Sequence, residues 1–294
     1  MLQAGYGTLP HCQSVLTALQ RYGLAQLLAP PLRYSRAIHA FMKLKELYRQ
    51  NDKVVVTAHR GFSGRYPENT LTAFRKAMEI GADIVEFDVR ETSDGQLVIL
   101  HDRMVDRTTN GQGAIRELPW AAVRTLNATY WREGVRHETP AGEDGIPLLT
   151  DALALMAGKV GLNIQVYTES PEALGKIVSL YLEHGLQESA FLMLASFRQA
   201  EAVRALSREV AICVGEEREN IARHVAFGVD FMQPRRTSLT GPLIGELLAS
   251  GIPFNVFSAN TEEEMRWLLD RGVCGILTDH PDRLLAVVGE HQPA

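Results

Sequence analysis

The chain has 294 residues, of which 46% are hydrophobic and 22% are charged, and these are the proportions of a soluble globular protein. This composition excludes a disordered or collagen-like chain, and three widely spaced cysteines fit neither a disulfide framework nor a thiolate zinc site. The formal net charge of -5 provides no basic surface for nucleic acid, and the length allows two ordinary domains or one large α/β barrel.

Residues 1–50 are expected to form an N-terminal helical extension. The segments Val15–Leu28 and Ala37–Tyr48 carry apolar residues at helical spacing and are separated by Pro30 and Pro31. We expect this extension to cover one end of the following domain or to join the subunits of a homo-oligomer. A lid over the functional site is the alternative.

No stretch of the sequence is apolar for long enough to span a bilayer. The best candidate, Ser14–Leu32, is interrupted by polar, charged and proline residues. The N-terminus also lacks the charged start, apolar run and cleavage site of a secretory signal. We therefore expect a cytoplasmic protein without a membrane span.

From Lys53 onward, short apolar runs rich in β-branched residues alternate with helical stretches. The predicted strands are Val54–Thr57, Ile84–Val89, Val160–Val166, Ala190–Ala195, Val210–Val214, Val229–Met232, Ile252–Phe257 and Cys274–Leu277. The clearest helical stretches are Pro171–His184, Arg198–Ser207, Ile221–Phe227 and Thr261–Asp270. Thr70, Ser170 and Thr261 stand where helix-capping residues are expected.

Strands too apolar to alternate with polar residues are typical of parallel strands buried on both faces. Eight such runs match a (β/α)8 TIM barrel, so we expect residues 51–294 to form one α/β barrel domain. A doubly wound open sheet is the alternative, but no G-x-G-x-x-G motif follows the first strand to support it.

One segment, residues 86–101, departs from this alternation and is predicted to form a hairpin about a two-residue Asp94-Gly95 turn. In that register His101 lies opposite Asp88, with Glu86 two residues along on the same face. The spacing therefore predicts an imidazole beside two carboxylates.

Active residues of such barrels lie at the carboxyl ends of the strands, where His59 and Arg60 are also expected. Two converging carboxylates repel each other, so one is protonated unless a cation neutralises them, and oxygen ligands suit Mg²⁺ or Ca²⁺ better than zinc. Two nearby histidines are free to act as general acid and base. The residues alone favour a metal-assisted hydrolytic site; structural histidines and a solvated acidic pair are the alternative.

A series of short motifs runs in order through residues 54–288. They are His59-Arg60-Gly61, Pro67-Glu-Asn-Thr70, Ala73-Phe74, Gly81-Ala-Asp83, Glu86-x-Asp88, Thr92-x-Asp94-Gly95, His101-Asp102 and Arg107-Thr-Thr-x-Gly111-x-Gly113. Weaker matches follow at Ile146-Pro147-x-Leu149, Ser196-Phe197 and Thr278-Asp279-x-Pro281. In type and spacing, these motifs resemble the glycerophosphodiester phosphodiesterase family.

The resemblance implies a (β/α)8 barrel that cleaves a small-molecule phosphodiester with a divalent metal, Mg²⁺ or Ca²⁺. By position, it implies that His59 and His101 are the catalytic acid/base pair and that Glu86 and Asp88 are metal ligands. It also implies that Arg60 contacts the phosphate.

Three pocket positions depart from the family pattern. Gln165 stands where the family has a third metal-binding glutamate, and Tyr167 stands where it has a lysine directed at the phosphate. Gln165 can still coordinate a hard cation, but with one negative charge fewer, so we expect weaker metal binding. Tyr167 donates a hydrogen bond without a positive charge. Phe257 lies near the position of a common tryptophan, and we expect it to contact substrate with Tyr167.

These departures leave several functions open. The first is hydrolysis of a glycerophosphodiester-like molecule to a phosphomonoester and an alcohol. A second is specificity for a sugar phosphodiester of the agrocinopine type. A third uses a substrate hydroxyl in place of water and forms a cyclic phosphate. The last is a non-catalytic binding protein, which the two retained histidines disfavour.

Overall fold

The computed structural model describes residues 43–50 and 53–291. The chain divides into two units, Met1–Arg36 and Ala37–Ala294, and all described residues lie in the second. The predicted helix Val15–Leu28 and most of the predicted helix Ala37–Tyr48 therefore lie outside the described residues.

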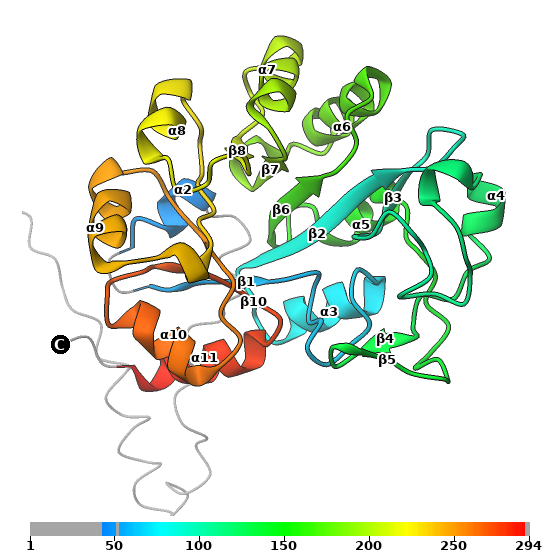
Figure 1. The fold of residues 1–294 in the computed structure, drawn as a ribbon, viewed down its shortest axis with the longest axis horizontal. Helices are drawn as coiled ribbons and strands as arrows, with labels where there is room; N and C mark the ends of the chain where they lie inside the picture. The colour runs from blue at the N-terminus through cyan, green and yellow to red at the C-terminus, as the bar shows by residue number, and fades with distance from the viewer. Residues whose placement is uncertain (1–42, 51–52, 292–294) are drawn as a thin grey trace, which may run out of the picture. The chain divides into compact units, whose positions relative to one another are not determined.

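One eight-stranded sheet forms the centre of the described chain (Figure 1). Seven strands run parallel in the order β8-β7-β6-β2-β1-β10-β9, and β3 pairs antiparallel with β2. The strands are β1 (Val55–Ala58), β2 (Ile84–Glu91), β3 (Leu97–Ile99), β6 (Gly161–Val166), β7 (Ala190–Leu194), β8 (Ile212–Val214), β9 (Val256–Phe257) and β10 (Gly275–Thr278).

Residues 230–235 occupy the eighth position around the barrel, between β8 and β9. The backbone amide of Phe231 donates to the carbonyl of Ile212 at 3.1 Å, which joins this segment to β8. Met232 forms a parallel bridge with Phe254, just before β9. Because β1 already pairs with β10, this segment closes the barrel, and the predicted (β/α)8 architecture is confirmed.

Helices cover the outside of the strands (Figure 1). They are α2 (Leu44–Leu47), α3 (Leu71–Glu79), α4 (Trp120–Val123), α5 (Leu149–Met156), α6 (Pro171–Glu183), α7 (Phe197–Leu206), α8 (Ile221–Phe227), α9 (Gly241–Ser250), α10 (Glu262–Leu269) and α11 (Pro281–Glu290). The predicted caps are confirmed, since Thr70, Ser170 and Thr261 each accept a backbone N–H three residues later. No described helix is both long and apolar enough to cross a lipid bilayer.

The short helix α2 packs against the amino-terminal end of the barrel. Leu44 and Leu47 are buried in one cluster with Val55 and Ile84, the first residues of β1 and β2. The described end of the predicted extension therefore covers the end of the barrel opposite to the carboxyl ends of the strands.

The β2–β3 hairpin forms, but its predicted register is wrong by one residue. Glu91 pairs with Leu97, so three residues rather than two make the turn between the flanking Thr92 and Gln96. Gly95 has φ of 76°, the left-handed conformation with which a three-residue turn ends.

The observed register changes which residue faces Asp88. The amide of Leu100 donates to the carbonyl of Asp88 at 3.0 Å, so Leu100 stands where His101 was predicted. The hydroxyl of Thr92 donates to the Asp94 carboxylate at 2.6 Å and accepts the amide of Gln96 at 3.0 Å. These hydrogen bonds within the turn explain why the longer turn is preferred.

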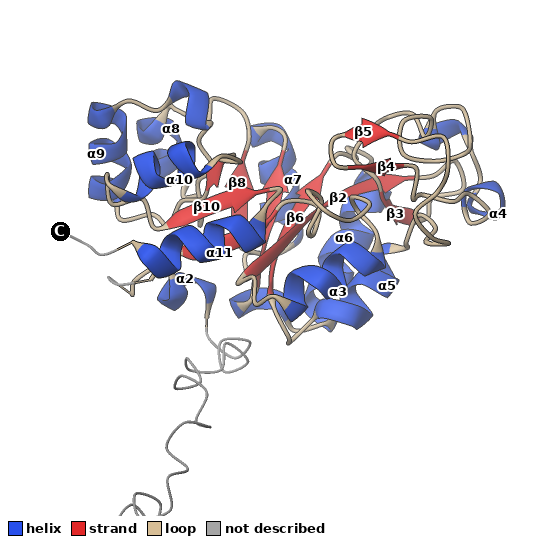
Figure 2. Cartoon of the chain, turned by 90° about the horizontal axis from the view of Figure 1, so that it is seen from below, coloured by secondary structure: helices blue, strands red, loops and turns tan. Residues whose placement is uncertain are grey.

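An insertion between β3 and α5 adds a small core of its own. It contains α4 and the short strands β4 (Trp131–Arg132) and β5 (Val135–Arg136), which lie on the side of the barrel where β3 extends (Figure 2). Its buried residues include Val105, Ile115 and Val123. The sequence pattern predicted no element in this segment.

Candidate active site

His59 follows β1 at the carboxyl end of the barrel. Its Nδ1 lies 2.6 Å from Oδ1 of Asp279, and its Nε2 lies 3.9 Å from Oε2 of Glu86. Burial lowers the pKa of His59, but the hydrogen bond to Asp279 and the charge of Glu86 outweigh it, so the pKa is raised. One ring nitrogen is thus held by a carboxylate while the other faces Glu86 of β2.

Asp279 follows β10 and orients His59. Its carboxylate also accepts hydrogen bonds from the Ser63 hydroxyl at 3.0 Å and from the Asn260 amide at 2.6 Å. Burial raises the pKa of Asp279, but the hydrogen bond and charge of His59 lower it well below its usual range. We did not predict a role for Asp279, although the Thr278-Asp279-x-Pro281 motif was a signal for it.

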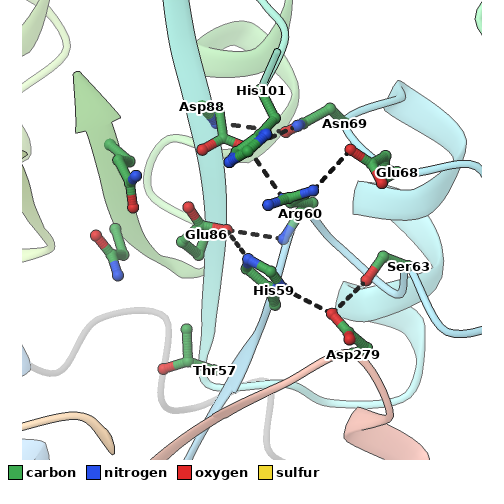
Figure 3. A network of polar contacts seen from close by, with 12 residues as sticks. Thr57, His59, Arg60, Ser63, Glu68, Asn69, Glu86, Asp88, His101 and Asp279 are labelled. Carbon is green, nitrogen blue, oxygen red and sulfur yellow. Dashed lines mark hydrogen bonds and ion pairs between the residues drawn. The ribbon is translucent and has the colours of Figure 1, made fainter. Parts of the chain in front are cut away.

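Glu86 and Asp88 project from β2 on the same face, as predicted, and both are buried. Figure 3 shows His59 beside Glu86 and His101 beside Asp88. Burial and the neighbouring charge of Asp88 raise the pKa of Glu86. Oε1 of Glu86 is buried without a hydrogen-bond partner, so this oxygen is available to a bound cation or to a donor.

A left-handed turn carries Arg60 over these carboxylates. Arg60 has φ of 53° and Gly61 has φ of 76°. A Cβ at Gly61 would come within 2.7 Å of the Ala73 backbone, so only glycine fits there. The turn brings the amide of Arg60 to 2.8 Å from Oε2 of Glu86.

The Arg60 side chain lies among three carboxylates. Its Nε is 3.3 Å from Oδ2 of Asp88, and its Nη1 donates to Oε1 of Glu68 at 2.8 Å. Burial lowers the pKa of Arg60, but the charges of Asp88, Glu68 and Glu86 raise it above its ordinary value. Arg60 is therefore a permanent cation at this site.

His101 is held in the same way as His59. Its Nδ1 lies 2.6 Å from Oδ1 of Asp102, whose Oδ2 accepts from Nε of Arg107 at 2.6 Å. Burial raises the pKa of Asp102, but the hydrogen bonds of Arg107 and His101 outweigh it and lower the pKa to about 2. Although the hairpin register differs from the prediction, His101 still reaches Asp88, because β3 ends at Ile99 (Figure 3).

Gln165 and Tyr167 lie beside the β2 carboxylates. Gln165 pairs in register with Asp88 across β2 and β6, and its side-chain amide donates to the hydroxyl of Tyr167. The Tyr167 ring meets His101 edge to face, with 5.5 Å between centroids. Burial and the charges of Asp88 and Glu86 raise the pKa of Tyr167, so its phenol stays protonated.

Phe257, at the end of β9, lies beside the other histidine. Its ring meets His59 edge to face with 5.4 Å between centroids. Nδ1 of each histidine therefore lies next to a carboxylate, and each imidazole ring meets one aromatic ring edge to face.

A cavity of about 340 Å³ opens beside His59 and Arg60. The insertion supplies part of its lining through Trp131 and Glu133, and Arg107 lies over the Trp131 ring at 4.6 Å. The structure therefore offers space for a small molecule next to the first histidine.

The oxygen atoms on β2 and β6 determine which kind of metal ion the site could hold. Among residues 43–50 and 53–291, no group of three or more His, Cys, Asp or Glu side chains has the arrangement of a metal site. Glu86 and Asp88 supply two carboxylates, and Gln165 supplies an amide in place of a third. The buried, unpartnered Oε1 of Glu86 fits a hard divalent cation, with one negative charge fewer than three carboxylates provide.

Comparison with known proteins gives one consistent result. The sequence matches the model described as the glycerophosphoryl diester phosphodiesterase family over residues 59–283. A glycerophosphodiester phosphodiesterase of Caldanaerobacter subterraneus subsp. tengcongensis is 29% identical over 243 residues, which are 80% of this chain and 98% of that protein. One from Bacillus subtilis is 27% identical over 251 residues, 79% of this chain and 85% of that protein.

Solved structures agree with this match. The crystal structure of a glycerophosphodiester phosphodiesterase from Agrobacterium tumefaciens has a TM-score of 0.68 and 24% identity, covering 79% of this chain and 99% of that one. The structure of an Oleispira antarctica phosphodiesterase in complex with the product sn-glycerol-3-phosphate has a TM-score of 0.67 and 25% identity. The match covers 81% of this chain and 97% of that one. The first shares the fold of this chain, and the second adds a relative with a bound product.

Proposed function

Because this chain belongs to the glycerophosphoryl diester phosphodiesterase family, we propose that it hydrolyses a small glycerophosphodiester to a phosphomonoester and an alcohol. One observation carries the proposal: His59 and His101 flank Glu86 and Asp88, and each histidine has its Nδ1 against a carboxylate. The Oleispira relative with its bound product, sn-glycerol-3-phosphate, supports the same type of reaction.

The two histidines provide general acid and base catalysis. A carboxylate on Nδ1 favours the tautomer in which Nδ1 carries the proton, which leaves Nε2 to exchange protons with the substrate. One histidine removes a proton from the attacking water, and the other protonates the alkoxide that leaves the phosphorus. Asp279 and Asp102 position these rings and stabilise their charged forms.

Glu86, Asp88 and Gln165 would hold a divalent cation, Mg²⁺ or Ca²⁺. Support comes from the unpartnered Oε1 of Glu86 and from the close approach of two buried carboxylates. When bound, the cation supplies positive charge to the non-bridging oxygens of the phosphate.

Arg60 supplies a second positive charge next to the same oxygens. Glu68 and Asp88 hold its guanidinium through Nη1 and Nε, so it is positioned before substrate arrives. Tyr167 and Phe257, whose rings lie against His101 and His59, would contact the alcohol groups of the substrate. In this proposal, phosphate binding and recognition of the attached groups use different residues.

Hydrolysis of glycerophosphocholine with Mg²⁺ or Ca²⁺ tests the proposal. Phosphorus NMR should show an open phosphomonoester that accumulates in proportion to enzyme. A folded protein that cleaves no member of a panel of glycerophosphodiesters would contradict the proposal and favour a non-catalytic binding protein.

A second candidate function follows from Gln165, Tyr167 and Phe257, which differ from the family pattern and lie beside Asp88 and the two histidines. It is specificity for a sugar phosphodiester of the agrocinopine type. Rates on such a compound and on glycerophosphocholine, measured side by side, distinguish the two; faster turnover of glycerophosphocholine excludes sugar specificity. A cyclic phosphate in the same spectra would indicate attack by a substrate hydroxyl instead of water.

A further inference from the structure

Two arginines at the active-site end of the barrel stand outside the ionic network described above. Arg90 lies near the end of β2, and Arg218 lies in the loop between β8 and α8. Both are half-buried. Neither forms an ion pair with any carboxylate of the described chain, in contrast to Arg60 and Arg107.

Arg90 lies against Tyr167. Its guanidinium carbon is 4.3 Å from the centre of the Tyr167 ring, and its Nε donates to the carbonyl of His101 at 2.7 Å. The ring and this hydrogen bond fix the guanidinium behind His101 while its terminal nitrogens have no protein acceptor among the described residues.

Arg218 has the corresponding position behind the other histidine. Its guanidinium carbon is 5.6 Å from the centre of the Phe257 ring. Its contacts with backbone are long, from Nε to the Gly215 carbonyl at 3.3 Å and from Nη1 to the Gln233 carbonyl at 3.5 Å. Both acceptors are neutral, and Arg218 forms no ion pair with a carboxylate of the described chain, although the charge of the neighbouring Glu219 acts on it.

Both guanidinium groups lie against an aromatic ring that in turn meets an active-site histidine. Because both side chains are half-buried, water solvates these charges incompletely. A partly desolvated cation without a partner is unfavourable, and a bound anion removes this cost. Arginine is also the residue best suited to bidentate binding of a carboxylate or phosphate.

We propose that Arg90 and Arg218 form a subsite for a second negatively charged group, carried by one alcohol of the phosphodiester substrate. This inference rests on the proposed hydrolytic function. Each arginine stands one aromatic ring away from a histidine, with Tyr167 next to His101 and Phe257 next to His59. The two arginines are therefore placed to contact a substituent of the substrate, while Arg60 and the β2 carboxylates serve the reacting phosphate.

The second anionic group is a carboxylate or a phosphomonoester, and matched substrates separate the two. Glycerophosphoserine differs from glycerophosphoethanolamine by one carboxylate. Glycerophosphoinositol 4-phosphate differs from glycerophosphoinositol by one phosphomonoester. We expect kcat/KM to be higher for the more anionic member of one of these pairs.

Arg218→Gln and Arg90→Gln should each reduce that substrate preference about tenfold, the effect of losing one charge-assisted hydrogen bond. Arg218→Lys should keep part of the preference because it keeps the charge. Arg223→Gln is the matched control, since Arg223 lies on α8, pairs with Glu217 and is outside the pocket. A preference that is absent in the wild type, or unchanged in both glutamine variants, would overturn the proposal.

Calorimetric binding to the His101→Ala protein provides a readout that does not depend on turnover. We expect it to bind the more anionic member of the pair more tightly, and to lose that difference when Arg218→Gln is added. If Arg218→Gln abolishes this difference in affinity but the wild type hydrolyses none of the substrates, the subsite is supported and the proposed function is contradicted. Hydrolysis without any charge-dependent binding would contradict the subsite and retain the function.

Discussion

The two sides of the active-site pocket have opposite electrostatic designs. On one side, which we call the network side, ion pairs link Arg60, Glu68 and Arg107 to Asp102 and Asp88. On the other side, which we call the aromatic side, Arg90 lies over the Tyr167 ring and Arg218 lies over the Phe257 ring. Neither arginine has an ion-pair partner in the described chain. The network side pairs its arginines with carboxylates, and the aromatic side leaves its two arginines without an ion pair.

This difference assigns separate tasks to the two sides. The network side holds each catalytic group by two or more contacts, as a site requires if it acts on a phosphate that every substrate shares. The aromatic side carries the departures from the family pattern at Gln165, Tyr167 and Phe257. We infer that the reaction is determined on the network side and that substrate choice is determined on the aromatic side.

The largest expected effect comes from removing either histidine. His59→Ala and His101→Ala should each lower kcat by about 10²-fold or more, because each removes a proton-transfer group. Steady-state rates on glycerophosphocholine measure this loss. His184→Ala, at the end of α6, is the control and should retain the wild-type rate. Near-normal turnover in either active-site variant ends that histidine's catalytic assignment.

Asp279→Asn should lower kcat by about 10²-fold without unfolding the protein, because asparagine does not stabilise the His59 tautomer with a proton on Nδ1. Nitrogen NMR of labelled histidine should show that this tautomer becomes less populated at His59. Asp270→Asn, after α10 and near His291, should change neither the rate nor the signal of His59. An unchanged tautomer in the Asp279 variant means that the carboxylate does not position the ring.

Glu68→Gln tests the stability of the network side. Arg60 and Arg107 both pair with this buried carboxylate, so its loss should lower the free energy of unfolding by about 3 kcal/mol at pH 7. Denaturant titration measures the change. Glu79→Gln, which breaks an exposed pair with Lys76 on α3, should cost less than about 1 kcal/mol.

The same variant should show a defined dependence on pH. Burial raises the pKa of Glu68, but the hydrogen bonds and charges of Arg107 and Arg60 outweigh it, so the pKa is lowered. The folded pKa lies below the unfolded value of about 4.3, so Glu68 contributes its full stability above that pH. The contribution is lost as the pH falls through the folded pKa. The difference in unfolding free energy between wild type and Glu68→Gln should therefore shrink toward acid pH. A difference that stays constant with pH would show that the ionised carboxylate of Glu68 does not stabilise the folded protein.

The smallest expected effect belongs to the aromatic side. Gln165→Glu adds a negative charge next to Glu86 and Asp88 and should tighten binding of Mg²⁺ or Ca²⁺ by about tenfold. Calorimetric titration of the metal measures this. Gln187→Glu, in the loop after α6, is the control and should leave the affinity unchanged. An unchanged affinity in the Gln165 variant removes this residue from the metal site.

Local patterns in the sequence were sufficient for much of the fold. The alternation of apolar runs and helical stretches predicts the barrel, because parallel strands buried on both faces leave that signature. Capping by Thr70, Ser170 and Thr261 depends only on residues three positions away, and all three caps are confirmed. Glu86 and Asp88 share a face because side chains of a strand alternate.

Other features did not follow from local patterns. The hairpin register was wrong because the two-residue and three-residue turns both fit Asp94-Gly95, and hydrogen bonds of Thr92 decide between them. The insertion after β3 was missed because its short elements lack a periodic pattern. Arg218 was missed because nothing in the sequence near it indicates which residues of the barrel face it.

The sequence by itself determined the barrel, its capped helices, and the histidines and carboxylates at the strand ends, since spacing along one strand or turn sets these features. Only the tertiary structure decided how the charges are paired. Asp279 meets His59 because β10 closes the barrel against β1, across 220 positions of sequence. Arg90 and Arg218, in contrast, form no ion pair within the described chain, although the charges of Asp88 and Glu219 act on them. Charge pairing depends on distances across the barrel, and these exist only after the strands have assembled.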